Sequence, residues 1–434
     1  MNKFLLLLVF NVFTFQSNAL LTNTEKEYLT DTFLKSSTTE IQTSLKTIIL
    51  SGKIRTLSKD QSNYIKNNIE QFCSSLIWTK KLDLSESNIE NLPDAIGKLI
   101  NLKQLDVSVN NISTLPNTIG DLKKLKELNI SGNQISNLPN TIGNLKELEV
   151  LKINENKIER LPESIVKLNQ LYALYASGNN INIFPDIIRN SYLQILELSD
   201  NQITTLPDIA EGFNELVELD LSNNQIEFLP NITGGLSQLK KLDLSYNHLK
   251  ITPDVLRKLT KLENLNLSNN QIEILPDEIK ELRKIKELNL SNNQLKTLPD
   301  TIEELSKLKR LYISNNLIET LPDTIGKLTN LKNLDLSNNE NLLSLPSSLR
   351  NLKDSLSVLN LINTNIQISC EEDALGKMDL KKIFGNHVSF SSHEEIILKV
   401  SINPIFALAQ FMNSDSFKLH ILMITAYLEL INMY

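Results

Sequence analysis

Hydrophobic and polar residues alternate along most of the chain in a pattern that returns every 22 to 23 residues. One clean copy, Leu262 to Lys284, reads LENLNLSNNQIEILPDEIKELRK. When its positions are numbered 1 to 23, Leu or Ile falls at 1, 4, 6, 11, 14, 18 and 21, Asn at 9 and Pro at 15. Self-similarity at such a fixed period is typical of solenoids, in which each unit buries its apolar side against its neighbours.

Each part of this unit predicts a local structure. Leu265-Asn266-Leu267 alternates apolar, polar and apolar residues, which predicts a very short strand with its leucines facing inward. Asn270 follows where the chain turns, and its amide can both donate to and accept from the backbone of a neighbouring turn. Pro276 fixes φ at the start of a short helical return, whose apolar face is Ile279 and Leu282.

The repeats are expected over residues 79–369, in about 12 to 13 units. One unit is irregular, because Glu340-Asn341 loosens its loop and the next unit, which begins at Leu356, starts later than the period predicts. The position-9 asparagines form a predicted structural ladder: Asn110, Asn133, Asn156, Asn179, Asn201, Asn224, Asn247, Asn270, Asn293, Asn316 and Asn339. At the two ends of the array the ladder becomes Ser87 and Thr364, where weaker hydroxyl partners suffice.

The motif L-x-x-L-x-L-x-x-N-x-I-x-x-L-P-x-x-I-x-x-L resembles the leucine-rich repeat family, and it covers Leu82 to Ile366. The Leu-Pro pair and the 23-residue length are similar to the Ras-suppressor-like subclass of that family. The resemblance implies an α/β leucine-rich-repeat solenoid, a curved horseshoe with parallel β-strands on its concave face. It also implies protein binding as the activity, without identifying a partner.

The N-terminal region differs from the repeats. Residues 1–19 combine Lys3, an apolar run from Phe4 to Phe15 and the small residues Ser17-Asn18-Ala19, which is typical of a cleaved signal peptide. The run is too short for a membrane-spanning helix, which needs roughly 20 apolar residues. Residues 20–78 show apolar spacing of helical period, and we expect a helical cap on the first repeat rather than a separate functional domain.

The C-terminal region, residues 370–434, is expected to contain a helical cap and an apolar tail. Ala374 to Val388 carries apolar residues at helical spacing, with Gly385 as its stop. The tail near its end is interrupted by Lys418, His420 and Glu429, which argues against a membrane-spanning helix and against a lipid-anchor signal. Packing of the tail onto the last repeat is the preferred interpretation.

Charge and cysteine content narrow the function. The formal net charge of −7 and the lack of a basic stretch argue against nucleic acid as a partner. Cys73 and Cys370 flank the array. Twelve strand spacings of about 4.8 Å would hold them roughly 50 to 60 Å apart, so they cannot form a disulfide with each other. Either the array alone stabilises the protein, or its working compartment is reducing.

We find no constellation of residues for catalysis. His387, His393 and His420 share a region but form no recognised metal motif, and two cysteines are too few for a four-thiolate zinc site. Cys370 precedes an acidic cluster, as in bacterial leucine-rich-repeat ubiquitin ligases, but the residues after it are too few for such a domain. No enzyme activity, cofactor, metal or small-molecule substrate is predicted.

Binding is therefore expected on the strands, where positions 2, 3, 5, 7 and 8 should project toward a partner. Most of these residues are polar, but the units from Leu148 to Leu216 offer apolar and aromatic residues bordered by acidic ones, which favours a protein partner with exposed Lys or Arg. The candidate binding residues are Val150, Tyr172, Tyr175, Ile195, Glu197, Val217, Asp220, Tyr246 and Tyr312. The alternative is that these aromatics are neutral variation.

Five glycan-acceptor sequons occur, at Asn111, Asn129, Asn231, Asn266 and Asn289. Three of them, at Asn129, Asn266 and Asn289, arise from the repeat's own strand motif, so they are weak indicators of glycans. The sequence as a whole predicts a secreted, monomeric, non-catalytic protein that binds another protein through its concave face. The alternative is a cytoplasmic signalling scaffold of the Ras-suppressor type that binds a small GTPase or its regulators.

Overall fold

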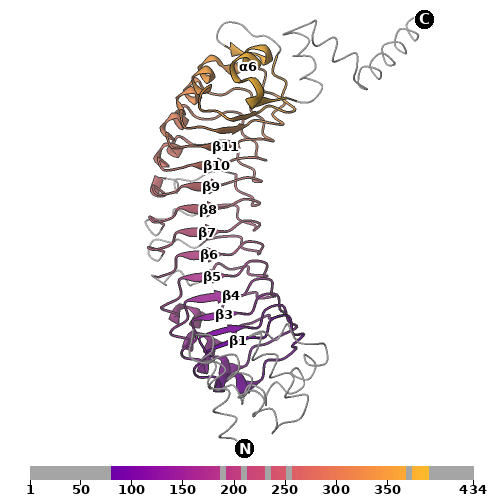
Figure 1. Ribbon diagram of the computed structural model, residues 1–434, viewed down its shortest axis with the longest axis vertical. Coiled ribbons are helices and arrows are strands. Elements are labelled where there is room, and N and C mark those ends of the chain that lie inside the picture. Colours follow the sequence, from indigo (N-terminus) through magenta and orange to yellow (C-terminus); the bar gives the residue numbers. More distant parts are fainter. Residues whose placement is uncertain are drawn as a thin grey trace, which may run out of the picture. The chain divides into compact units, whose positions relative to one another are not determined.

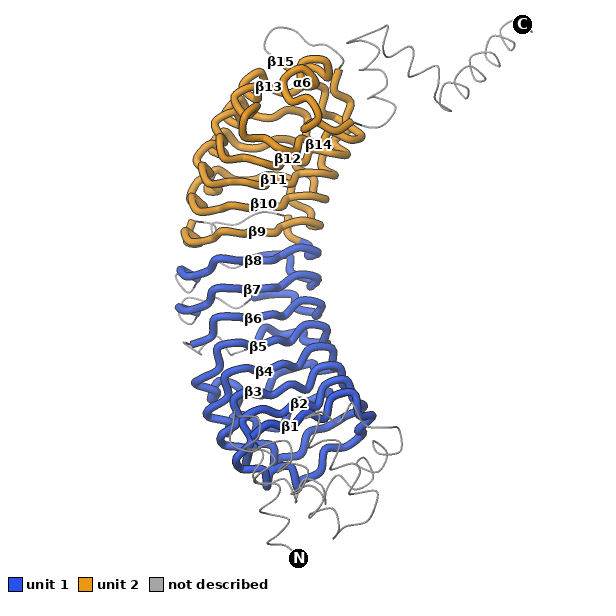
Figure 2. Tube along the Cα trace, viewed as in Figure 1, with its two compact units in different colours: residues 1–248 blue, residues 249–434 orange. Residues whose placement is uncertain are grey.

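A computed structural model describes residues 80–185, 192–206, 213–229, 236–250, 257–367 and 374–390 (Figure 1). The chain divides into two compact units, residues 1–248 and residues 249–434, and each unit is described by itself (Figure 2). The predicted signal peptide, the predicted N-terminal cap and the apolar tail lie outside the described residues, as do Cys73 and Cys370.

The described residues of the first unit contain eight three-residue strands that pair in sequence order, all parallel. They are β1 (Lys81–Asp83), β2 (Gln104–Asp106), β3 (Glu127–Asn129), β4 (Val150–Lys152), β5 (Ala173–Tyr175), β6 (Ile195–Glu197), β7 (Glu218–Asp220) and β8 (Lys241–Asp243). Each strand covers repeat positions 3 to 5, so a buried leucine stands between two side chains of the opposite face, as alternation along a strand requires; these are half-buried or exposed except for Ala173.

In the part of the second unit that the structure describes, the same arrangement occurs in five strands, β9 (Asn264–Asn266), β10 (Glu287–Asn289), β11 (Arg310–Tyr312), β12 (Asn333–Asp335) and β14 (Val358–Asn360). The strand β16 (Val388–Ser389) pairs in parallel with β14 and is the last strand of this sheet. A separate antiparallel pair joins β13 (Leu345–Pro346) to β15 (Ala374–Leu375).

The register of the strands confirms the period read from the sequence. Leu105 pairs with Leu128 at the usual spacing of the repeat, whereas Leu174 pairs with Leu196 across a slightly shorter unit. The irregular unit also behaves as predicted, because Leu334 pairs with Leu359 across a longer stretch of chain. The extra residues are absorbed outside the strand, so the leucine ladder of the second unit stays in register.

The core is a stack of similar apolar layers. In the unit that contains β3 the apolar residues with at most 6% exposure are Leu125, Leu128, Ile130, Ile135, Leu138, Ile142 and Leu145. Full burial of one such side chain contributes about 1.5–3 kcal/mol. Packing of these layers therefore holds the strands in place. The side chains at positions 3 and 5, on either side of the buried leucine of each strand, lie on the opposite face of the sheet.

Where the structure describes the helical returns of the repeats, they are short 3₁₀ turns. In the first unit they are η3 (Asp94–Lys98), η4 (Asn117–Asp121), η5 (Asn140–Asn144) and η6 (Glu163–Lys167). In the second unit they are η9 (Asp277–Glu281), η10 (Asp300–Glu304), η11 (Asp323–Lys327) and η12 (Ser347–Leu352). The position-15 proline precedes each turn; Pro139, with φ −68°, accepts a hydrogen bond of 2.9 Å from the Ile142 N–H.

The position-9 asparagines fill the turns after the strands with hydrogen bonds. Asn133 Nδ2 donates to the carbonyl oxygens of Val107 (3.0 Å) and Ile130 (2.9 Å), and its Oδ1 accepts from the Ile112 N–H (3.0 Å). The first of these bonds joins Asn133 to the preceding repeat. Each buried amide therefore satisfies backbone groups that would otherwise be unpaired.

The C-terminal segment of the second unit contains α6 (Lys377–Phe384), which is the one α-helix among the described residues. It is shorter than the helix predicted over 374–388, because Ala374–Leu375 forms β15 and Val388 begins β16; Gly385, whose φ is +55°, follows its last residue. A short 3₁₀ turn, η13 (Gly385–His387), then leads into β16. Glycine, which lacks a Cβ, adopts such a positive φ at little steric cost.

Candidate protein-binding surface

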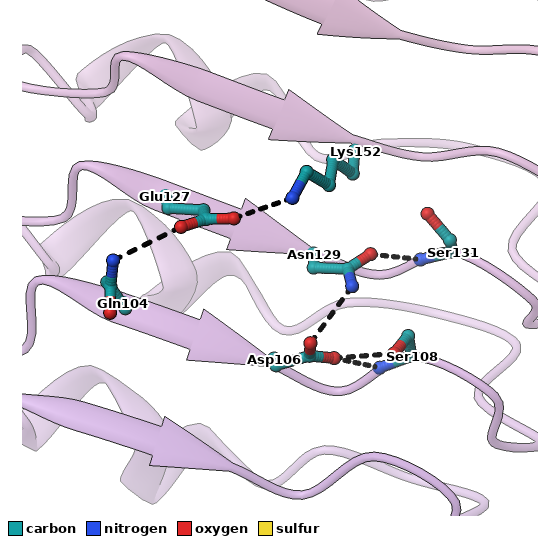
Figure 3. A network of polar contacts seen from close by, with 7 residues as sticks. All are labelled: Gln104, Asp106, Ser108, Glu127, Asn129, Ser131 and Lys152. Atoms are coloured by element: carbon teal, nitrogen blue, oxygen red, sulfur yellow. Dashed lines mark hydrogen bonds and ion pairs between the residues drawn. The ribbon is translucent and has the colours of Figure 1, made fainter.

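We call the side of each sheet that carries the position-3 and position-5 side chains the strand face. On β2 to β4 this face is a closed polar network (Figure 3). Glu127 accepts a hydrogen bond from Gln104 (3.2 Å) and pairs with Lys152 (2.7 Å), while Asn129 donates to Asp106 (3.0 Å). These polar groups form hydrogen bonds and ion pairs with one another across neighbouring strands, so few of them need a hydrogen-bonding partner from another molecule.

Position 5 has a structural task in most units. Asp106 Oδ1 accepts from both the backbone N–H (2.9 Å) and the hydroxyl (2.6 Å) of Ser108, which closes the turn after β2. The same pairing occurs between Asp83 and Ser85, Asp220 and Ser222, Asp243 and Ser245, Asn266 and Ser268, and Asp335 and Ser337. An Asp or Asn at position 5 thus uses one of its side-chain oxygens to accept hydrogen bonds within the local turn.

Three neighbouring strands depart from this rule. Position 5 of β4, β5 and β6 is Lys152, Tyr175 and Glu197, and none of the three forms a hydrogen bond of the Asp–Ser type with the described residues of its own turn. The turn after β5 is held from the previous strand instead, since the Ser177 N–H donates to Asn154 Oδ1 at 2.9 Å. The three side chains are therefore released from the local turn and extend over the strand face.

Apolar side chains surround these released residues. Val150 of β4 lies in register with the fully buried Ala173 of β5, which in turn lies in register with Ile195 of β6. Tyr172 and Val217 occupy position 2, directly before β5 and β7, and Tyr172 is 41% exposed. Exposed apolar surface of this kind on an otherwise polar face is typical of interaction sites.

We define the β4–β7 patch by the seven predicted residues that these strands bring together: Val150, Tyr172, Tyr175, Ile195, Glu197, Val217 and Asp220. Within it Tyr175 is in register with Glu197, and Glu197 with Asp220. Side chains in register on adjacent strands lie about 4.8 Å apart, so an aromatic ring and two carboxylates form one continuous row.

The electrostatics of this row are unfavourable. Burial raises the pKa of the Glu197 carboxyl, and the charges of Asp220 and Glu218 raise that pKa further. Burial also raises the pKa of Asp220; hydrogen bonds from Ser222 oppose this shift, and Asp243 and Asp200 add to it. The pKa of the Tyr175 phenol is raised by burial and by Glu197. The carboxylates of Glu197 and Asp220 therefore lie close together although their negative charges repel each other.

Lysine side chains form ion pairs with acidic residues near the row, but not with Glu197 or Asp220 within the described residues. Lys126 pairs with Glu149 (2.5 Å), and Lys241 pairs with Glu218 (2.8 Å). Among the residues that the structure describes, no Lys, Arg or His forms an ion pair with Glu197 or Asp220. A cationic group from outside would relieve the repulsion between these carboxylates.

Two predicted residues stand apart from the patch. Tyr246 lies in the turn after β8, with φ +53° and 60% exposure. Tyr312 belongs to the second unit, on β11, beside Arg310, which pairs with Glu287. Burial and the charge of Glu287 raise the pKa of the Tyr312 phenol. Tyr246 is therefore a turn residue outside the row of Tyr175, Glu197 and Asp220, and Tyr312 belongs to a different row, in register with Asn289 and Asp335.

One expectation about the repeat template is wrong. Position 7 does not project toward a partner in many units, because its serine is buried. The hydroxyl donates to the position-5 side chain in Ser85, Ser108, Ser245, Ser268 and Ser337, whereas the buried Ser314 donates to Ser291 of the preceding repeat. Conversely, sequence reasoning missed Lys152 as a member of the released group. The signal was present, since β4 lacks the Asp/Asn-x-Ser pattern of its neighbours.

The described residues contain neither a metal-binding cluster nor a membrane-spanning helix. No group of three or more His, Cys, Asp or Glu side chains there is arranged to hold a metal ion. Within the same parts of the chain, no helix is long and apolar enough to cross a lipid bilayer.

Comparison with known proteins identifies the family. A profile described as a leucine-rich repeat region matches residues 119–192 and 256–392, and a leucine-rich repeat profile matches residues 79–135, 191–249 and 216–272. A comparison with curated proteins gives no significant match. The chain is 30% identical to a leucine-rich-repeat protein of Leptospira interrogans, with 74% of each chain covered and a TM-score of 0.62. This protein belongs to the leucine-rich repeat family, and its fold is the leucine-rich-repeat solenoid.

Two further solved structures share the fold. An internalin of Listeria monocytogenes is 23% identical, with 71% of this chain and 90% of that chain covered and a TM-score of 0.61. A plant peptide hormone receptor, RGFR1 in complex with RGF2, is 29% identical, with a TM-score of 0.58. The match with the receptor covers 68% of this chain but only 49% of that chain.

Proposed function

We propose that this chain is a secreted leucine-rich-repeat protein that binds another protein through the β4–β7 patch of its strand face. The observation that carries the proposal is the row of Tyr175, Glu197 and Asp220 in register on β5, β6 and β7, with the two carboxylates lacking an ion pair within the described residues. The partner would present a Lys or Arg side chain next to an apolar one.

The chemistry of the patch supports this class of partner. Tyr172 and Tyr175 offer rigid rings that lose little conformational entropy on binding, which is why tyrosine is common among residues that dominate binding energy. A guanidinium or ammonium group above Tyr175 would also meet the ring face as a cation–π contact. Glu197 and Asp220 would accept its hydrogen bonds, and such charge-assisted bonds are roughly twice as strong as neutral ones.

The comparisons support the same type of activity. The plant peptide hormone receptor RGFR1 was solved in complex with RGF2, so a structural neighbour of this chain is known in a complex. The predicted signal peptide at residues 1–19 supports secretion, and we expect the mature chain to begin at Leu20. The alternative of a cytoplasmic scaffold of the Ras-suppressor type rests on the length of the repeat and its Leu-Pro pair.

A displayed library of random peptides, selected on the immobilised full-length protein, tests the proposed partner chemistry. We expect enrichment of peptides with Lys or Arg beside an aromatic or aliphatic residue, and at least tenfold weaker binding of these peptides to Tyr175→Ala and to Glu197→Gln. The matched control is Val358→Ala, an exposed apolar residue at position 3 of β14 in the second unit. Selected peptides without basic residues, or binding that survives both patch variants, would contradict the proposal.

N-terminal sequencing tests secretion separately. The protein is recovered from its native source, with the medium and the cell lysate assayed in parallel. A start at Leu20 in the medium supports export. An intact Met1 confined to the lysate would overturn secretion and would favour the cytoplasmic scaffold, while leaving the peptide-binding test of the patch unaffected.

A further inference from the structure

We propose that Asn111 is the attachment site of an N-linked oligosaccharide. This inference rests on the secretion part of the proposed function, because the lipid-diphosphate-linked oligosaccharide that donates the sugar is met inside the secretory pathway. Four of the five sequons lie in described residues, at Asn111, Asn129, Asn266 and Asn289, and the structure separates the first of them from the other three.

The sequon at Asn111 faces outward. Asn111 and Ser113 are both exposed, and Ile112 between them is fully buried. The backbone is held in this orientation from both sides, since the Asn111 N–H donates to the Ile89 carbonyl oxygen (2.8 Å) and the Ile112 N–H donates to Asn133 Oδ1 (3.0 Å). The acceptor amide and the sequon hydroxyl are therefore presented together to solvent on an extended segment.

The Asn111 amide is also chemically available. Its side chain makes no hydrogen bond to any other residue that the structure describes, so a new bond at Nδ2 breaks none of the contacts present there. At this repeat position the side chain stands on the loop that follows the strand and its turn. A sugar attached there extends into solvent rather than across the sheet.

The three strand sequons are engaged in the fold. Asn129 Nδ2 donates to Asp106 (3.0 Å), and its Oδ1 accepts from the backbone N–H of Ser131, the serine of its own sequon (3.1 Å). Asn266 and Asn289 accept in the same way from Ser268 and Ser291, at 3.1 Å each. All three asparagines are half-buried strand residues, and Asn129 has Asp106 and Lys152 in register on its two sides. A sugar on Nδ2 would crowd side chains only about 4.8 Å away.

Transfer of the oligosaccharide to Asn111 is a substitution at a sugar carbon and needs no oxidant or reductant. Asn111 Nδ2 forms a bond to C1 of the reducing-end sugar, the bond from C1 to the lipid diphosphate breaks, and the diphosphate leaves with the electron pair while Nδ2 loses one proton. The product is compatible with the proposed binding. Asn111 follows β2, whereas the β4–β7 patch begins two strands further on, a separation of about 10 Å or more along the sheet.

Peptide mapping of the full chain, expressed in cultured eukaryotic cells with its own residues 1–19 and recovered from the medium, tests this assignment. We expect a glycan on Asn111 and none on Asn129, Asn266 or Asn289. Asn111→Gln and Ser113→Ala should each lose that glycoform completely, and Ser113→Thr should keep it, because Thr also completes the sequon. Asn129→Gln is the control and should leave the glycan pattern unchanged.

The outcomes distinguish the proposals. Secreted protein with a bare Asn111, or with its glycan on a strand sequon instead, overturns the glycan site and leaves the binding proposal intact. Protein that stays in the cell without any glycan overturns both secretion and the glycan site, and the peptide selection still decides the role of the patch. Circular dichroism of each variant confirms that it has folded.

Discussion

Asn156 Nδ2 donates a hydrogen bond of 3.0 Å to the carbonyl oxygen of Ile130, 26 residues earlier in the preceding repeat. The same nitrogen also donates to the Ile153 carbonyl oxygen (3.1 Å), and Oδ1 accepts from the Ile135 N–H (3.0 Å). One buried side chain thus ties together the turns of two repeats. The stability of the stack depends on such ties as well as on the apolar layers.

We therefore expect Asn156→Ala to reduce the free energy of unfolding by about 3 kcal/mol, since each buried polar group left without a partner costs about 1–3 kcal/mol. Urea unfolding measures the loss, and amide hydrogen exchange should show faster opening at Ile135, whose N–H loses its acceptor. The control is Lys157→Ala at the next, exposed position, which should change stability by less than about 0.5 kcal/mol. Slow exchange at Ile135 in Asn156→Ala would contradict this account.

The 3₁₀ turns make a second kind of contact between repeats. A Cβ on Gly120 would stand 2.4 Å from the Thr141 carbonyl oxygen and 2.7 Å from Thr141 Cβ. A glycine is therefore needed at position 19 where turns stack so closely. The clash involves backbone, so a smaller side chain at Thr141 cannot relieve it.

Gly120→Ala should accordingly destabilise the protein by about 1–3 kcal/mol, the range for overpacking, although Gly→Ala in an unstrained position stabilises by about 0.4–1 kcal/mol. Thermal or urea unfolding measures the change. The matched control is Lys280→Ala, at the same repeat position in η9, where a side chain is already accommodated. A stabilising Gly120→Ala would show that the turns can separate without loss.

Position 8, in the turn that follows each strand of the repeat, adopts left-handed backbone with a positive φ. Most residues at this position tolerate that conformation, such as Gly132, Asn223 and Asn292. Val109 does not, because its φ of +54° places a β-branched side chain in a region that L-residues avoid at a cost of about 1–2 kcal/mol. Its side chain is 59% exposed, so little packing compensates.

Val109→Asn should therefore stabilise the protein by about 1 kcal/mol, and the reverse change Asn292→Val should destabilise it by a similar amount. Both effects are measured by urea unfolding. Equal stabilities of Val109→Asn and the unaltered protein would mean that the side chain of Val109 makes contacts that offset its backbone strain.

The sequence predicted the apolar layers, the strand register and the asparagine turns, because each depends on a residue type that recurs at one position. Leu265 and Leu267 are buried as their alternation requires, and the longer unit after Leu334 stays in register. The repeat pattern did not predict those features that depend on a contact between the side chains at two positions. The Ser268 hydroxyl donates a hydrogen bond to Asn266 Oδ1, and Ser268 is buried. Alternation along the strand alone does not predict this burial.

The candidate site was predictable to the same extent. Tyr172, Tyr175 and Ile195 stand out in the sequence because they replace polar residues at fixed positions. The sequence did not reveal that Tyr175 is free of the local turn, since this follows from the hydrogen bond between the Ser177 N–H and Asn154 Oδ1 of the preceding repeat. Nor did it separate Tyr246, which occupies a left-handed turn residue, from the tyrosines next to the strands.

Tyr175 and Tyr312 occupy the same repeat position in different surroundings, which gives a matched pair of variants. Tyr175 is in register with Glu197, whereas Tyr312 lies next to Arg310 and in register with Asp335. We expect Tyr175→Ala to weaken the selected basic peptides by about 2 kcal/mol or more, the range of dominant interface residues, and Tyr312→Ala to weaken them by less than about 0.5 kcal/mol. Isothermal titration calorimetry measures both; equal losses would mean that the β4–β7 patch is not the site.

The raised pKa values of Glu197 and Asp220 predict opposite effects of acid on stability and on binding. In the folded protein these carboxyls take up protons at a higher pH than in the unfolded chain, whose values are about 4.3 and 3.9. Between the raised pKa values and those of the unfolded chain the folded state binds more protons, so these two groups add stability as the pH falls through that window.

Binding of a basic peptide requires the charged carboxylates, so affinity should fall over the same window in which these groups stabilise the free protein. Calorimetric titrations from pH 7 to about pH 4, with urea unfolding at each pH, measure both trends, and the window lies around and above the ordinary carboxyl range. Glu197→Gln combined with Asp220→Asn should flatten both, while Asp335→Asn in the second unit should leave both unchanged. Affinity that stays constant or rises on acidification would remove the two carboxylates from the proposed contact with a cation.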